Sequence, residues 1–158
     1  MASPSTADLK ELRSRVLAGR KRGHHYVALL GLRNYDVVSI YQSVRKGIPY
    51  SAFEHFQRNT ALATDMVAAL AGIPKRTLAR RKELGRFEPE ESDRLVRLAR
   101  LFGRALDLFE SDADAAREWL TTPQRGLGNV VPFELGKTDI GATEVENFIG
   151  RLEYGIPA

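Results

Sequence analysis

The sequence predicts an all-α protein built from small helical units. Its 158 residues are enough for one or two domains with a core of modest size. Apolar residues recur at intervals of three and four, which is the spacing of one face of an α-helix, and Gly or Pro residues separate these stretches. No stretch alternates apolar and polar residues as a half-buried strand does.

The first predicted helices lie between residues 35 and 60. One begins near Tyr35 and ends at residues 47–49, and its apolar residues Val37, Ile40, Tyr41 and Val44 share one helical face. Ser51 and Glu54 form a capping-box pattern, which predicts the start of a second helix that runs to about residue 58.

Two short helices are predicted to flank a tight turn in the middle of the chain. The first covers residues 65–71, the second covers residues 75–83, and the Gly-Ile-Pro stretch at 72–74 separates them. This order predicts a helix-turn-helix unit. On the first helix, the residues expected to face inward are Met66, Val67 and Leu70.

A long helix is predicted to follow. Pro89 is typical of a first helical position, and Glu90 and Glu91 are acidic residues in the first turn, where they interact favourably with the helix dipole. The apolar stripe of this helix comprises Leu95, Leu98, Phe102, Ala105, Leu106 and Phe109.

Shorter elements are predicted after residue 110. Ser111 or Asp112 is expected to cap a short helix, and a glycine-containing loop, RGLGNVVP, follows it. Pro132 opens one further turn, and Thr143 with Glu146 is expected to cap the last helix. The apolar side of that helix comprises Val145, Phe148, Ile149 and Leu152.

Charge is divided unevenly along the chain. The net charge is +4, with 20 Lys and Arg against 12 Asp and Glu in residues 1–110, and 4 against 8 in residues 111–158. We expect a basic N-terminal arm at residues 1–24, a helix-turn-helix domain at residues 25–110 and a small helical domain at residues 111–158. A basic body and an acidic end predict two different partners.

Composition excludes several classes of protein. No apolar run approaches the roughly 20 residues that cross a bilayer, and no secretory signal pattern is present, so we expect a cytoplasmic protein without a membrane partner. The absence of cysteine excludes disulfides and thiolate metal sites. His24, His25 and His55 lack a nucleophile, paired carboxylates or ligand spacing around them, so we expect no catalytic residue, metal or cofactor.

Basic residues are concentrated in the stretch KRTLARRKELGR that follows the turn. On a helical wheel, Leu78 and Ala79 mark the inward side. In helix-turn-helix proteins the second helix enters the major groove, and the planar fork of arginine pairs with guanine or phosphate. The pattern predicts a face for double-stranded DNA, with a solvated basic surface as the alternative. Its residues are Arg76, Thr77 and Arg80, with Lys75, Arg81 and Lys82 at the margins.

Three stretches resemble the Xre/MbcA/ParS-like antitoxin family. They are KGIPYSAFEHFQ, GIPKRTLARRKELGRFEPEESDRLVRLARL and WLTTPQRGLGNVVPFELGKTDIGATEVENFIGRLEYGIPA, and they occur in the family's order. The resemblance implies a non-catalytic antitoxin of a type II toxin–antitoxin pair. Such an antitoxin binds operator DNA to repress its own operon, and its C-terminal part covers a RES-domain toxin that consumes NAD.

The resemblance also assigns residues. The family's DNA-binding motif falls on Lys75, Arg76, Thr77, Arg80 and Arg81. Its toxin-facing motif falls on Trp119, Leu120, Pro123, Gly126, Gly128, Pro132, Gly141, Glu144, Arg151, Glu153, Tyr154 and Gly155. We expect toxin contacts at Glu144, Arg151, Glu153, Tyr154, Gly155, Ile156, Pro157 and Ala158. Family members commonly end in a small or aromatic residue after the terminal glycine and apolar pair, whereas this chain ends in GIPA.

A helix that presents Arg151 and Tyr154 and ends in a short apolar segment is suited to fill a cavity. Burial of Ile156 contributes about 1.5–3 kcal/mol, and Pro157 limits the conformations lost on docking. A frayed terminus is the alternative, and Trp119 is expected to pack inward. For the whole chain, the rival is a stand-alone transcription regulator with a C-terminal dimerisation domain. A homodimer or higher oligomer is expected.

Overall fold

The structure is a computed structural model that describes residues 25–34 and 36–155. The basic arm predicted at residues 1–24 and the last three residues, 156–158, lie outside the described part. The described residues form nine α-helices and no extended strand, so the all-α prediction is confirmed. The helices are α2 (His25–Leu29), α3 (Val37–Lys46), α4 (Tyr50–Thr60), α5 (Thr64–Leu70), α6 (Lys75–Leu84), α7 (Pro89–Leu108), α8 (Ala113–Thr121), α9 (Pro132–Leu135) and α10 (Asp139–Glu153), with a 3-10 turn, η2 (Arg125–Leu127), between α8 and α9.

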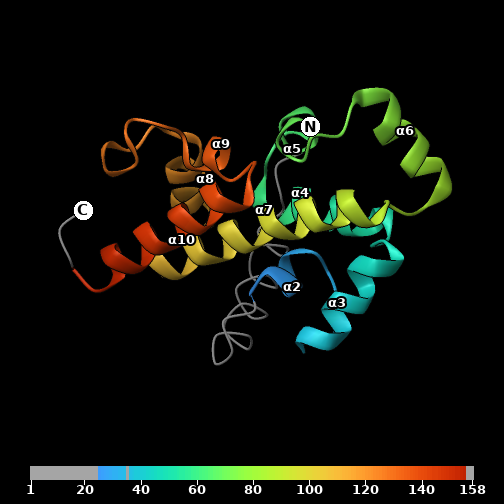
Figure 1. Cartoon of the computed structure of the whole chain (residues 1–158), viewed down its shortest axis with the longest axis horizontal. Coiled ribbons are helices and arrows are strands. Elements are labelled where there is room, and N and C mark those ends of the chain that lie inside the picture. Colours follow the sequence, from blue (N-terminus) through green and yellow to red (C-terminus); the bar gives the residue numbers. More distant parts are fainter. Residues whose placement is uncertain (1–24, 35, 156–158) are drawn as a thin grey trace.

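Helix α7 is the central element of the fold (Figure 1). Its 20 residues span about 30 Å, and it packs against α2, α3 and α4 as well as against α8 and α10. Pro89 and a capping box between Glu88 and Glu91 begin the helix. The predicted apolar stripe is buried from Leu95 to Leu106, and Phe109 forms the C-cap, where it is partly buried.

Aromatic contacts fill the core on both sides of α7. Phe56 of α4 meets Phe102 of α7 edge to face, with ring centroids 6.3 Å apart. Trp119 of α8 stacks on Phe148 of α10 at 6.1 Å and also contacts Phe109. Trp119 is therefore packed against the core, although it remains partly exposed.

The capping prediction at Ser51 was wrong. Helix α4 begins one residue earlier, and Pro49 occupies the N-cap without a side-chain cap bond. Ser51 therefore lies inside the helix, where a serine-x-x-glutamate pattern carries no capping information. The extended backbone of Pro49 starts the helix instead.

The capping prediction at Thr143 was also wrong. Helix α10 begins at Asp139, where the hydroxyl of Thr138 accepts a hydrogen bond from the Gly141 N–H at 3.0 Å. Thr143 lies a full turn inside the helix and donates its hydroxyl to the Asp139 carbonyl. The cap at the start of α8 is Asp112, one of the two residues expected there.

Three predictions of inward-facing residues were wrong or incomplete. Met66 and Ala79 are exposed, and only Val67 and Leu70 of the predicted α5 set are buried. Helix α6 buries only Leu78, so the helical wheel does not determine whether its neighbour Ala79 also faces inward. Helix α5 buries Ala68 together with Val67 and Leu70, and this leaves Met66 outside its buried face. Leu152 lies at the edge of α10 and is also exposed.

No helix in the described part of the chain is long and apolar enough to cross a membrane.

Candidate functional site

The first candidate face is built on the turn between α5 and α6. Gly72 has φ +65°, a left-handed conformation that glycine adopts without strain. The Ile73 N–H then donates to the Ala68 carbonyl at 2.8 Å, and the Ile73 side chain is buried. This turn, with buried Leu78, anchors α6 to the body while the rest of the helix stands away from it (Figure 1).

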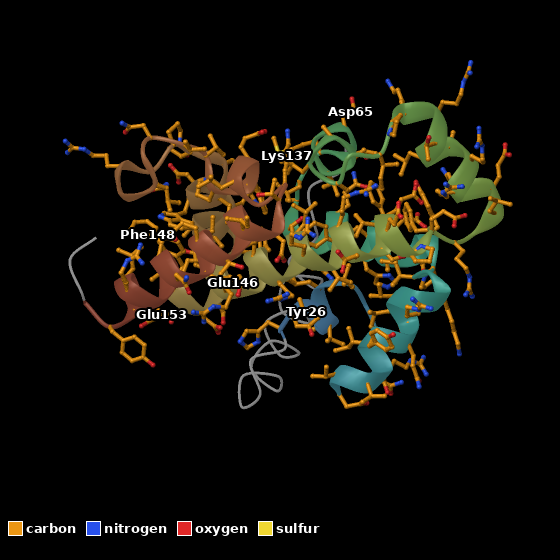
Figure 2. All side chains as sticks on the ribbon, viewed as in Figure 1. Tyr26, Asp65, Lys137, Glu146, Phe148 and Glu153 are labelled. Carbon is orange, nitrogen blue, oxygen red and sulfur yellow. The ribbon has the colours of Figure 1, made fainter. Side chains whose placement is uncertain are left out.

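Most predicted DNA-binding side chains on α6 are unengaged. Lys75, Arg76, Arg80 and Lys82 are exposed and form no hydrogen bond or ion pair with other described residues, and Thr77 is half-buried. Figure 2 shows long side chains extending from α6 into solvent. This part of α6 therefore presents a cationic surface available to an anionic partner.

Arg81 differs from the other basic residues of α6. Its Nε donates to Glu91 Oε1 at 2.7 Å and its Nη2 donates to Glu91 Oε2 at 3.3 Å, a bidentate pair between α6 and α7. Only 13% of the Arg81 side chain is exposed. Arg81 holds α6 against α7 and does not extend from the surface as the sequence pattern predicted.

Glu91 is the partner in this contact and is buried near the start of α7. Its Oε1 also accepts the Glu88 N–H at 2.8 Å. Burial opposes ionisation of the carboxyl, but the Arg81 and Glu88 hydrogen bonds and the charges of Arg81 and Arg94 outweigh it, so the pKa of Glu91 lies below its ordinary value. Glu91 is thus ionised and fixed beneath the basic helix.

Backbone contacts also fix the end of α6. The Tyr50 N–H donates to the Gly85 carbonyl at 2.9 Å, and the Phe87 N–H donates to the Ile48 carbonyl at 3.0 Å. A Cβ at Gly47, which has φ +88°, would lie 2.0 Å from the Phe87 carbonyl oxygen. The α3–α4 turn therefore packs directly against the chain that leaves α6.

The second candidate face is the end of α10. Arg151 Nη2 donates to Glu144 Oε1 at 3.2 Å, and its guanidinium lies 5.6 Å from the centre of the Phe148 ring. Tyr154, in contrast, is 83% exposed. Gly155 has φ +67°, and no other atom of the described residues lies within 4 Å of its Cβ position.

Helix α10 is fixed to α7 by ion pairs on one side. Arg100 pairs with Glu146 at 3.1 Å and Arg104 pairs with Glu153 at 3.3 Å. Glu146 and Glu153 lie along α10 in Figure 2. Of the predicted toxin-contact residues, Glu144, Arg151 and Glu153 therefore have partners within the chain, Tyr154 extends from it, and Ile156, Pro157 and Ala158 lie outside the described residues.

Other residues of the toxin-facing motif have evident structural roles. A Cβ at Gly141 would lie 1.9 Å from the Leu135 carbonyl oxygen, so this glycine permits close packing of α10 on α9. Gly128 has φ +68° in the loop that follows η2. Leu120 and Pro132 are buried.

Metal-ligand geometry is absent from residues 25–34 and 36–155, where no three His, Asp or Glu side chains are placed to hold an ion. His25 is buried and its Nε2 lies 2.6 Å from Asp107 Oδ1. Sequence reasoning missed this contact and also missed the short helix α2, which the apolar run YVALL could have indicated.

A helix-turn-helix with an exposed basic helix, joined to a second helical unit whose last helix ends in the exposed Tyr154, defines a two-unit helix-turn-helix protein. Comparison with known families agrees with this division. Residues 39–100 match the antitoxin Xre-like helix-turn-helix domain, and residues 104–155 match the antitoxin Xre/MbcA/ParS C-terminal toxin-binding domain.

Individual relatives agree with these family matches. The chain is 38% identical to antitoxin Xre of Yersinia enterocolitica over 115 residues, which cover 72% of this chain and 78% of the relative. It is 37% identical to antitoxin Xre of Photorhabdus laumondii over 114 residues, which cover 72% and 77%. A protein named Prs ADP-ribosylating antitoxin, from Sphingobium, is 26% identical over 141 residues, which cover 82% and 86%. The chain belongs to the Xre antitoxin family.

Proposed function

We propose that this antitoxin neutralises a RES-domain toxin, which degrades NAD, by occluding the toxin's active site with its C-terminal segment. We also propose that it binds operator DNA through α6 and represses its own operon, and that it acts in the cytoplasm as a homodimer or higher oligomer. The observation that carries the proposal is the separation of two exposed faces, α6 and the end of α10, on either side of one packed helical body (Figure 1).

The proposed DNA contacts divide by role. We assign base-edge contacts to the exposed Arg76 and Arg80, with Thr77 beside them, and phosphate contacts to the exposed Lys75 and Lys82. Arg81 supports the others by fixing α6 to Glu91.

Loss of the reading arginines tests this face. Arg76→Ala and Arg80→Ala should each weaken binding to the operon's own promoter by about 1–3 kcal/mol for a lost base contact. Binding is measured by fluorescence titration at fixed salt, with Arg125→Ala as a control, because Arg125 is an exposed arginine in the η2 turn. Unchanged promoter affinity in both α6 variants would remove these residues from the reading face.

The proposed toxin contacts centre on Tyr154 and the residues that follow it. Tyr154 is an exposed aromatic side chain at the end of a helix, a favourable anchor for a pocket. The neighbouring Arg151 is held by Glu144 and Phe148, so it is presented to a partner in a fixed orientation. Occlusion of this kind requires no chemistry from the antitoxin.

Truncation after Leu152 tests the second face. Cells that co-express the truncated chain with the toxin should lose NAD and stop growing, whereas promoter binding by the same truncated chain should persist. NAD content and growth are measured against the full chain. Retained protection would exclude the C-terminal segment as the neutralising element.

The stand-alone regulator remains the rival function. It would bind DNA in the same way but would have no toxin partner. A RES-type reading frame beside the gene, and co-purification of its product with this chain, favour the antitoxin. A chain that purifies alone in the presence of that product favours the regulator.

A further inference from the structure

Basic residues outside α6 gather where α3 ends. Arg45 and Lys46 form part of the last turn of α3, are exposed, and form no ion pair with other described residues. Helix α3 itself explains part of this charge, because cations near a helix C-terminus interact favourably with its dipole. The dipole does not explain Arg86, an exposed arginine outside α3 that lies at the same place.

Arg86 is held beside the end of α3. Its Nη1 donates to the Lys46 carbonyl at 3.2 Å, one of the last carbonyls of α3, which lack partners within the helix. The hydrogen bond from Phe87 to Ile48 and the close approach of Gly47 to Phe87 fix the same junction. A guanidinium carries five N–H groups, so other donors of Arg86 remain available for a partner outside the chain.

This junction continues directly from α6. Arg86 lies two residues after the end of α6 and four residues after Lys82, which is exposed on its last turn. In Figure 1 the C-terminal ends of α3 and α6 meet near the start of α7. Residues 45–46 and 82–86 hold four basic residues and one acidic residue, Glu83, so their net charge is +3. Positive charge therefore extends from α6 across the junction to α3.

The dimensions of α6 and of DNA place this junction near a row of phosphates. Helix α6 has 10 residues and is about 15 Å long, whereas the major groove of B-DNA is about 12 Å wide. In helix-turn-helix proteins the N-terminal residues of the second helix reach the base edges. With Arg76 and Arg80 at the bases, the C-terminal end of α6 extends toward the rim of the groove, where the phosphates lie.

We propose that Arg45, Lys46 and Arg86 bind the phosphate backbone of operator DNA beside the α6 site. This inference rests on the proposed function, because it extends the proposed DNA face to a second element, the end of α3. Phosphate contacts fix the register and orientation of a protein on the duplex and carry no sequence information directly. The planar guanidinium of Arg86 suits a bidentate contact with phosphate, and Arg45 and Lys46 add charge beside it.

Glutamine substitutions test this contact with little change in shape. Arg45→Gln and Lys46→Gln in the full chain each remove one charge and keep most of the aliphatic stem. If each residue neutralises one phosphate, the slope of log affinity against log salt should decrease by about 0.9 in each variant and by about 1.8 in the double variant. Affinity for the promoter and for an unrelated duplex should fall by the same factor. Fluorescence titrations of both duplexes across a salt series measure these effects.

Arg33→Gln is the matched control, because Arg33 is an exposed arginine that precedes α3, at the opposite end from Arg45. Its salt slope should equal that of the wild type. Arg76→Ala is a second reference, since loss of a base contact should weaken promoter binding more than binding to the unrelated duplex.

The other outcomes overturn the inference in distinct ways. An unchanged salt slope in the double variant, with promoter binding still weakened by Arg76→Ala, removes the junction contact and keeps the proposed DNA function. A lower Tm with an unchanged slope leaves the α3 dipole as the only role of Arg45 and Lys46. A wild type that binds neither duplex removes both the inference and the proposed DNA function. If circular dichroism shows that the double variant does not fold, the slopes of the two single variants decide.

Discussion

At the residue scale, Glu91 has two structural roles. Its carboxylate completes the capping box at the start of α7 and also receives both hydrogen bonds from Arg81. The orientation of α6 relative to α7 therefore depends on this buried carboxylate as well as on the α5–α6 turn and the backbone contacts at the end of α6. The side chains proposed to contact DNA, among them Arg76 and Arg80, belong to the helix that this carboxylate positions.

Replacement of this carboxylate should weaken both the fold and the proposed DNA face. We expect Glu91→Gln to lower the free energy of unfolding by about 1–3 kcal/mol at neutral pH, because a buried hydrogen-bonded charge pair is lost. Promoter binding should weaken although Glu91 does not reach the surface. The control is Glu90→Gln, an exposed glutamate in the same turn. Urea unfolding and promoter titration measure the two effects.

The difference in unfolding free energy between the wild type and Glu91→Gln should depend on pH in a definite direction. The folded-state pKa of Glu91 is lowered, so its ionised form stabilises the fold at pH values above the pKa of the unfolded chain, near 4.5. This contribution decreases as the pH falls through that value toward the folded-state pKa. The wild type and Glu91→Gln should therefore differ most at neutral pH and converge in acid. A difference that grows in acid would contradict this account of the ion pair.

The Arg81–Glu91 contact shows what sequence patterns at this scale cannot reveal. The helical wheel placed Arg81 at the margin of the predicted DNA face. The loop between α6 and α7, however, brings Glu91 beneath that position, and this depends on tertiary packing. The basic character of α6 could be predicted, but the division between free and paired side chains could not.

At the element scale, α10 depends on a close approach to α9. The predicted start of α10 at Thr143 missed the first turn, because the hydrophobic pattern becomes regular only from Val145 onward. That turn holds Gly141, whose missing side chain allows the Leu135 carbonyl to lie against it. Helix α10 presents Tyr154 at its C-terminal end and is thus positioned by the packing of its N-terminal turn.

A pair of glycine substitutions within α10 tests this packing. Gly141→Ala should destabilise the protein strongly, because its Cβ would overlap the Leu135 carbonyl oxygen at 1.9 Å. Gly150→Ala is the control: its Cβ would meet only Arg104 at 3.9 Å, and alanine favours a helix by about 1 kcal/mol over glycine. Thermal unfolding should show a lower Tm for the first and an equal or higher Tm for the second. Equal Tm values for both would exclude the close approach.

Other elements differ in how far the sequence predicted them. Pro89 and the acidic first turn located the start of α7 correctly, and Gly72 located the turn before α6. These signals are local and act through backbone geometry or the helix dipole. In contrast, the α3 pattern indicated a helical face but not that Val37 and Tyr41 would remain exposed, because exposure depends on which other elements reach α3.

At the scale of the whole molecule, α7 joins the two halves. The helix-turn-helix match ends at residue 100 and the toxin-binding match begins at residue 104, both within α7. The ion pairs Arg100–Glu146 and Arg104–Glu153 then connect this helix to α10. The predicted domain boundary at residue 110 stays a prediction. It lies after the end of α7, the helix that both halves share.

The division of charge along the chain agrees with two separate partners, one for each half of the molecule. The basic first part carries the proposed DNA face, where positive charge favours phosphate contacts. The acidic last part carries the proposed toxin face, and its charge disfavours binding of that end to the same duplex. The proposed toxin contact depends on neutralisation by occlusion rather than on a remote effect on the toxin.

Inhibition kinetics test that occlusion most directly. The purified toxin's consumption of NAD is measured with the full chain at increasing NAD concentrations. If the C-terminal segment occupies the NAD site, NAD and the antitoxin exclude each other, so the antitoxin concentration needed for half-inhibition should rise linearly with NAD. Half-inhibition at the same antitoxin concentration at every NAD level would contradict the proposal.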